Sequence, residues 1–164
     1  MNITVLAVIK WLSSLIVVAS LSLSVTAGAE VSAINTKGLF NDYAIKGYDA
    51  VSYWDQSPAK GDKAFSVEWR GATWLFSSQA HLDKFMLNPV QYAPQYGGYC
   101  AWAMADGKGR AVNIDPQAWS IYQDKLYLNY NQNVLKEWLK TKDSDIEVAD
   151  KNYPNISDVK TYIK

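Results

Sequence analysis

The stretch of sequence that decides the fold is TWLFSSQAHLDKFMLNPVQY, residues 73–92. Its first four residues are apolar or β-branched, as strand residues usually are, and Arg70-Gly71 separates them from a similar run at residues 64–69. Two such runs joined by a short glycine-containing turn predict a β-hairpin. Ser77 or Ser78 can cap a helix directly after it, because a serine hydroxyl accepts a hydrogen bond from an early backbone N–H. The sequence therefore predicts a hairpin followed at once by a helix.

The predicted helix over residues 78–88 has one apolar face. Leu82, Phe85 and Met86 recur at three-four spacing, so we expect these three side chains to be buried. Asn88-Pro89 should end the helix, because the residue before a proline avoids helical dihedral angles, and should start a short second turn.

The rest of the chain supplies the other predicted elements. We expect a short strand over residues 45–54, a turn at Asp115-Pro116, and a second hairpin from residues 119–122 and 125–130. Two separate helices are predicted at residues 131–140 and 146–152. Because strands and helices do not alternate regularly, we expect an α+β fold: a small, mainly antiparallel sheet from two hairpins with two or three helices packed on it.

Residues 1–29 have the pattern of a secretory signal peptide. Lys10 gives a positive flank, residues 11–25 form an apolar run, and Ala27-Gly28-Ala29 matches a small-residue cleavage site. We therefore expect a periplasmic or secreted protein whose mature chain begins at Glu30, with no stable membrane insertion after cleavage. The 135 residues from 30 to 164 suit a single domain with a C-terminal helical extension.

The charge pattern argues against a nucleic-acid partner. The chain has 16 basic and 16 acidic residues, and removal of the segment that holds Lys10 leaves 15 against 16, with no basic run. No phosphate-binding glycine loop or Ser-His-Asp pattern stands out, so hydrolase and kinase activities are not expected. Cys100 is the only cysteine, so the fold must hold without an intramolecular disulfide.

A resemblance to a known family rests on the same stretch that decides the fold. The aromatic strand at residues 73–76 leads into a short helix that ends in F-x-x-N-P-x-x-Y at residues 85–92, and this resembles the core of the YHS domain. Upstream, Tyr48-Asp49-Ala50-Val51 resembles the Asp-Pro-Val segment that opens the domain. The similarity covers roughly residues 45–95.

The resemblance implies a binding role. Residues 96–102 and 119–130 look like the exported, single-domain branch of the family, which includes selenoproteins and so implies redox or soft-metal chemistry. Metal-associated YHS domains usually carry cysteines at three places, where this chain has Ser52, Ser77 and His81. A serine hydroxyl is a poor ligand for soft metals, so the family's standard cysteine site is absent.

A different soft-metal site is predicted from Cys100 and His81, with weaker support for Met104 and Met86. Copper(I) favours thiolate, thioether and imidazole ligands, and these residues lie between positions 81 and 104. A soft transition metal such as copper is therefore the candidate cofactor.

Two alternatives stay open. Cys100 could serve a thiol-dependent redox protein or enzyme, with His81 as its base. Alternatively, aromatic side chains could line a pocket for a small molecule or a periplasmic protein partner. The candidate ligand-binding residues are Tyr48, Asp49, Tyr96, Tyr99 and Trp102, with Trp74 as a further aromatic and Asp115 as a further acid. We expect a binding protein without catalytic activity.

Overall fold

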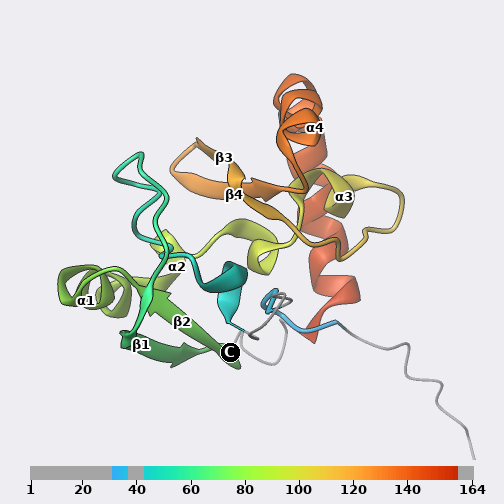
Figure 1. The fold of residues 1–164 in the computed structure, drawn as a ribbon. Coiled ribbons are helices and arrows are strands. Elements are labelled where there is room, and N and C mark those ends of the chain that lie inside the picture. Colours follow the sequence, from blue (N-terminus) through green and yellow to red (C-terminus); the bar gives the residue numbers. More distant parts are fainter. Residues whose placement is uncertain (1–30, 37–42, 159–164) are drawn as a thin grey trace, which may run out of the picture.

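The computed structural model describes residues 31–36 and 43–158. The predicted signal peptide at residues 1–29 lies outside these residues. Within them the chain forms two hairpins, each with helices beside it (Figure 1). The predicted α+β fold is confirmed, and the two hairpins remain separate two-stranded sheets rather than joining in one sheet.

The first hairpin forms where it was predicted. Strand β1 (Asp62–Trp69) pairs antiparallel with β2 (Ala72–Phe76). Arg70 and Gly71 form the turn with φ angles of 50° and 72°, the left-handed conformation that suits a tight two-residue hairpin turn. The turn therefore places a long cationic side chain at the end of the hairpin.

Helices α1 (Gln79–Leu87) and α2 (Pro89–Tyr92) follow as predicted. Ser78 Oγ caps α1 by accepting a hydrogen bond from the backbone N–H of His81 at 3.3 Å. Asn88 caps α2 in the same way through Gln91.

The packing of α1 differs from the prediction at one residue. Phe85 is fully buried, and its ring lies 5.6, 5.2 and 5.0 Å from the rings of Trp69, Trp74 and Phe76. Leu82 is partly buried, but Met86 is 58% exposed, so its predicted burial was wrong. The helix contacts the hairpin along a narrow stripe centred on Phe85, and Met86 lies outside that stripe.

The strand predicted over residues 45–54 was also wrong. The chain instead forms a short 3-10 helix, η1 (Ala44–Gly47), and then a series of turns, with one isolated bridge from Tyr48 to Lys60. Asp49 causes the turns, because its Oδ1 accepts hydrogen bonds from the backbone N–H groups of Val51 at 2.8 Å and Ser52 at 3.3 Å.

The second hairpin forms from β3 (Asp115–Tyr122) and β4 (Lys125–Asn129). Its turn is at the predicted Gln123-Asp124, with φ angles of 49° and 53°. The turn predicted at Asp115-Pro116 was wrong, because these residues begin β3.

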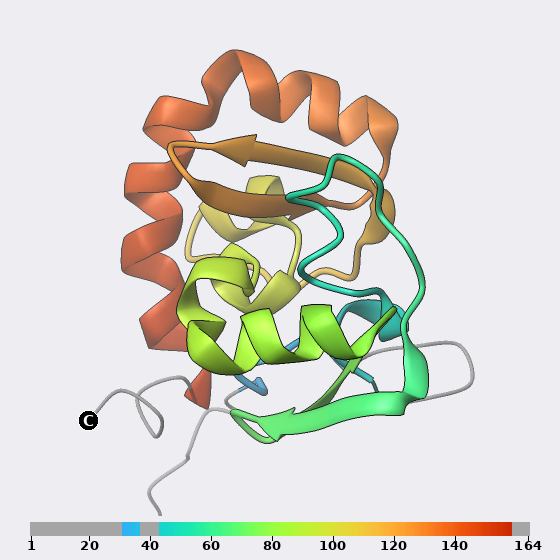
Figure 2. The same ribbon diagram turned by 90° about the vertical axis from the view of Figure 1, so that its left-hand side faces the viewer.

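The segment between the hairpins contains η2 (Gln95–Gly98) and the short helix α3 (Ala101–Ala105). The C-terminal part is one helix, α4 (Gln132–Ile156), and not the two helices that were predicted. It passes along the second hairpin and then down the side of the molecule (Figure 2). Among the described residues, no helix combines the length and apolar character needed to cross a membrane.

Candidate functional site

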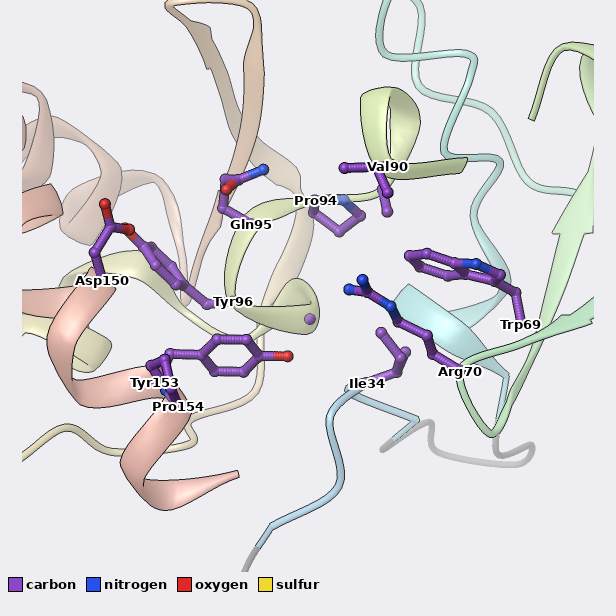
Figure 3. A pocket seen from close by; sticks show the side chains of 12 residues that line it. Ile34, Trp69, Arg70, Val90, Pro94, Gln95, Tyr96, Asp150, Tyr153 and Pro154 are labelled. Atoms are coloured by element: carbon purple, nitrogen blue, oxygen red, sulfur yellow. The ribbon is translucent and has the colours of Figure 1, made fainter. Parts of the chain in front are cut away.

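A cavity of about 250 Å³ lies where four separate parts of the chain meet, one of them the N-terminal segment with Ile34. The turn of the first hairpin contributes Trp69 and Arg70, the segment before α3 contributes Pro94 and Tyr96, and the last turns of α4 contribute Asp150 and Tyr153 (Figure 3). The volume is slightly below the usual range for ligand pockets, so it suits a small molecule.

Arg70 is the cationic group of this cavity. Its guanidinium carbon lies 4.5 Å from the centre of the Trp69 ring, a cation–π contact that holds the side chain in place. Figure 3 shows the guanidinium pointing into the cavity. Among the described residues, no carboxylate lies within 4.0 Å of it.

The opposite wall carries two tyrosines whose hydroxyls donate hydrogen bonds to other parts of the protein. Tyr96 donates a hydrogen bond to Asp150 Oδ1 at 3.0 Å, and Tyr153 donates one to the backbone oxygen of Ala33. Burial raises the pKa of Tyr96, and it raises the pKa of Tyr153 to about 12. Both hydroxyls therefore stay protonated at neutral pH and act as fixed donors rather than as bases.

The glycine in this wall permits the close approach of two segments. Gly97 has a φ of 61°, and a Cβ built on it would lie 1.7 Å from the backbone oxygen of Ala33. Any side chain at this position would separate the N-terminal segment from η2.

The structure places the predicted ligand-binding aromatics in several different environments. Tyr96 lines the cavity, whereas Tyr99 is buried in the core beside α4 and Tyr48 packs against the other core cluster. Trp102 is 40% exposed and lines two other hollows of the surface. Trp74 is fully buried core. The predicted set therefore does not form one pocket.

Asp49 and His81 come together at a second polar site. Asp49 is fully buried, and its Oδ2 lies 2.6 Å from His81 Nδ1, while His81 Nε2 lies 3.1 Å from Asp55 Oδ2. Ser77 donates to the same Asp49 oxygen through its hydroxyl at 2.6 Å and its backbone N–H at 2.9 Å. These donors compensate the buried charge of Asp49.

The polar side chains of this second site contact one another and the backbone. Both ring nitrogens of His81 face carboxylate oxygens of separate residues. The hydroxyl of Ser52 donates to the backbone oxygen of Asp49 and accepts from Ala59, so it stabilises a turn. Among residues 31–36 and 43–158, no group of three or more His, Cys, Asp or Glu side chains could hold a metal ion.

Cys100 lies elsewhere. Its side chain is buried, and Sγ donates to Asn129 Oδ1 at 3.6 Å. Burial raises the pKa of the thiol, which disfavours the nucleophilic thiolate. The residue lines a cavity of about 220 Å³ with Arg110 and Tyr130, whereas Met104 packs in the core cluster beside α4. The contacts of the His81 ring include none of these residues.

Sequence reasoning missed Arg70, Asp150 and Tyr153. An available signal was the arginine in a hairpin turn, where Asn, Asp or Gly is usual. Asp150 and Tyr153 are one helical turn apart and share a face of α4, but the predicted helix ended at residue 152, before Tyr153.

Comparisons with known proteins give one finding. No curated protein and no solved structure shows a match to this chain. A family model described as the YHS domain matches residues 50–96, a range that includes the first hairpin, α1 with His81, and the cavity residues Arg70 and Tyr96. Residues 50–96 therefore form a YHS domain.

Proposed function

We propose that this protein is an exported YHS-domain binding protein that holds a small molecule in the cavity between the first hairpin and α4. The observation that carries the proposal is the Arg70 guanidinium, which points into that cavity without a carboxylate partner among the described residues. An arginine held over Trp69 at a concave site is suited to bind a polar group of a ligand.

Export is the second half of the proposal, and it rests on the signal-peptide pattern of residues 1–29. Expression in a bacterial host followed by fractionation and mass measurement tests it. We expect the protein outside the cytoplasm with Glu30 at its N-terminus. A full-length chain retained in the cytoplasm would contradict export.

The binding proposal is tested by blocking the cavity. Val90 lines it and is 64% exposed, so Val90→Trp should fill part of the space without disturbing the core. Val148→Trp is the matched control, because Val148 is an exposed residue of α4 that does not line this cavity.

A fragment library of small acids, amines, zwitterions and neutral compounds is screened by ¹⁵N NMR. We expect at least one fragment to shift the amide signals of Arg70 and Gly97. Its binding should be weakened in Val90→Trp and unchanged in Val148→Trp. A screen in which no fragment depends on Val90 in this way would rule out the cavity as a binding site.

A soft-metal site at Cys100 is the second candidate function. The Cys100 side chain is buried, but it lines a cavity that a metal ion could enter. Anaerobic copper(I) titration of the protein and of Cys100→Ser tests this role. Stoichiometric binding that is lost in the variant would support it, and no binding tighter than millimolar would exclude it. The thiol-enzyme alternative would need a base other than His81, because the His81 ring contacts Asp49, Asp55 and Ser77.

A further inference from the structure

The cavity beside α4 carries charges of opposite sign on two of its walls. Arg70 comes from the turn of the first hairpin, and Asp150 comes from α4. Figure 3 shows the two side chains on opposite sides of the cavity, with Tyr96 next to Asp150 on the side that faces Arg70. They are not paired with each other, because no ion pair joins them.

Arg70 presents a site for a carboxylate. Its planar guanidinium has several N–H donors in a fixed fork, and this fork matches the two oxygens of a carboxylate. The contact with Trp69 orients the fork before a ligand arrives, so less conformational entropy is lost on binding.

Asp150 presents a site for a cation. Its Oδ1 accepts a hydrogen bond from Tyr96, which fixes the carboxylate at the cavity wall. Among the described residues, no cationic group lies within 4.0 Å of the Asp150 carboxylate, and a carboxylate has room for several donors. An ammonium group is a compact donor that suits this position.

We propose that the cavity binds a small zwitterion, a molecule of amino-acid type with its carboxylate on Arg70 and its ammonium on Asp150. The apolar part of the ligand lies against Val90 and Pro94. This inference rests on the proposed function of the cavity and adds the ligand class. A dianion or a dication would place one of its charges against a wall of the same sign, and the volume of about 250 Å³ limits the ligand to a small molecule.

The experiment compares molecules that share one carbon skeleton. Isothermal titration calorimetry at low salt uses α-amino acids and the ω-amino acids β-alanine, γ-aminobutyrate, δ-aminovalerate and ε-aminocaproate. For the tightest of them, the deaminated acid and the decarboxylated amine are then measured. We expect both truncated compounds to bind about tenfold or more weakly than the zwitterion, because each loses a hydrogen bond to a charged group.

Two conservative variants assign each charge to a wall. Arg70→Gln should weaken the binding of the zwitterion and of the acid but not that of the amine. Asp150→Asn should weaken the binding of the zwitterion and of the amine but not that of the acid. The asparagine can still accept the hydrogen bond from Tyr96, so the wall is kept. The matched controls are Arg110→Gln and Asp143→Asn, because neither residue lines this cavity. Arg110 pairs with Asp106, and Asp143, which lies on the same helix as Asp150, accepts a hydrogen bond from the Tyr122 hydroxyl. Neither control should change the affinity.

The outcomes separate the ligand class from the binding role. If the acid or the amine binds as tightly as the zwitterion, or if no zwitterion binds, the ligand class is wrong. If a neutral fragment still binds in a manner that depends on Val90, the cavity remains a binding site while the zwitterion is excluded.

Discussion

The network around Asp49 shows how one buried residue organises a whole loop. Its two oxygens accept hydrogen bonds from the backbone of Val51 and from Ser77, and the His81 ring lies against it. The carboxylate therefore joins the turns after η1 to the start of α1. Removing its charge would leave several donors without an acceptor in a buried place.

We expect Asp49→Asn to lower the free energy of unfolding by about 3 kcal/mol, because the new amide group would face the donors of Ser77. His81→Ala should cost about 1–2 kcal/mol, since Asp49 keeps its other partners. Urea denaturation at neutral pH measures both.

Asp55→Asn is the control for these variants. Asp55 contacts the other nitrogen of the same His81 ring but its side chain is 51% exposed, so its loss should cost less than about 1 kcal/mol. If Asp49→Asn were no more destabilising than Asp55→Asn, the buried network would not be what holds the loop.

The turn of the second hairpin, between β3 and β4, allows a prediction about stability. Gln123 and Asp124 both adopt left-handed dihedral angles, which are strained for residues with side chains. Replacing them with Asn-Gly should raise the free energy of unfolding by about 0.5–1 kcal/mol. Urea denaturation measures this change. Asp124→Ala is the control, because alanine disfavours a positive φ and should not stabilise the turn. A variant with Asn-Gly no more stable than wild type would show that the turn is not strained.

The hairpins and α1 could be predicted from the sequence because their signals are local. Runs of strand-forming residues on both sides of Arg70-Gly71 specify a hairpin, and Ser78 specifies a helix start. The alternating residues around Tyr48 predicted a strand that does not form, because the buried Asp49 side chain accepts backbone hydrogen bonds that stabilise turns. The polar residues 141–145 looked like a break in a helix, but α4 continues through them because Trp138 and Ala149 on either side are both buried against the core.

The candidate site was harder to predict because it forms between distant segments. Arg70 and Asp150 are far apart in the sequence and meet only through the way α4 packs on the rest of the chain. Tyr96 was predicted as a ligand residue and does line the cavity, whereas Tyr99 beside it in the sequence is turned into the core. Alternate sides of an irregular segment cannot be assigned from periodicity.

The whole molecule holds its two core clusters together without a disulfide, and buried tyrosines contribute to both. Burial raises the pKa of Tyr53, Tyr96 and Tyr99, and it raises the pKa of Tyr127 and Tyr153 from the ordinary 10.0 to about 12. The folded state therefore retains protons that the unfolded state releases above pH 10.

This difference predicts the pH range of alkaline unfolding. Below pH 10 both states keep these tyrosine protons, so the stability contribution is fully present; as the pH rises from 10 towards 12, only the unfolded state ionises, and the free energy of unfolding falls. We expect tyrosinate absorbance from the buried rings to appear together with the loss of circular dichroism, in one cooperative step. In Tyr127→Phe the free energy of unfolding should fall less steeply over this range, because one linked proton is removed. Ionisation of these tyrosines near pH 10 in a chain that remains folded would mean that the two clusters admit water far more readily than their burial implies.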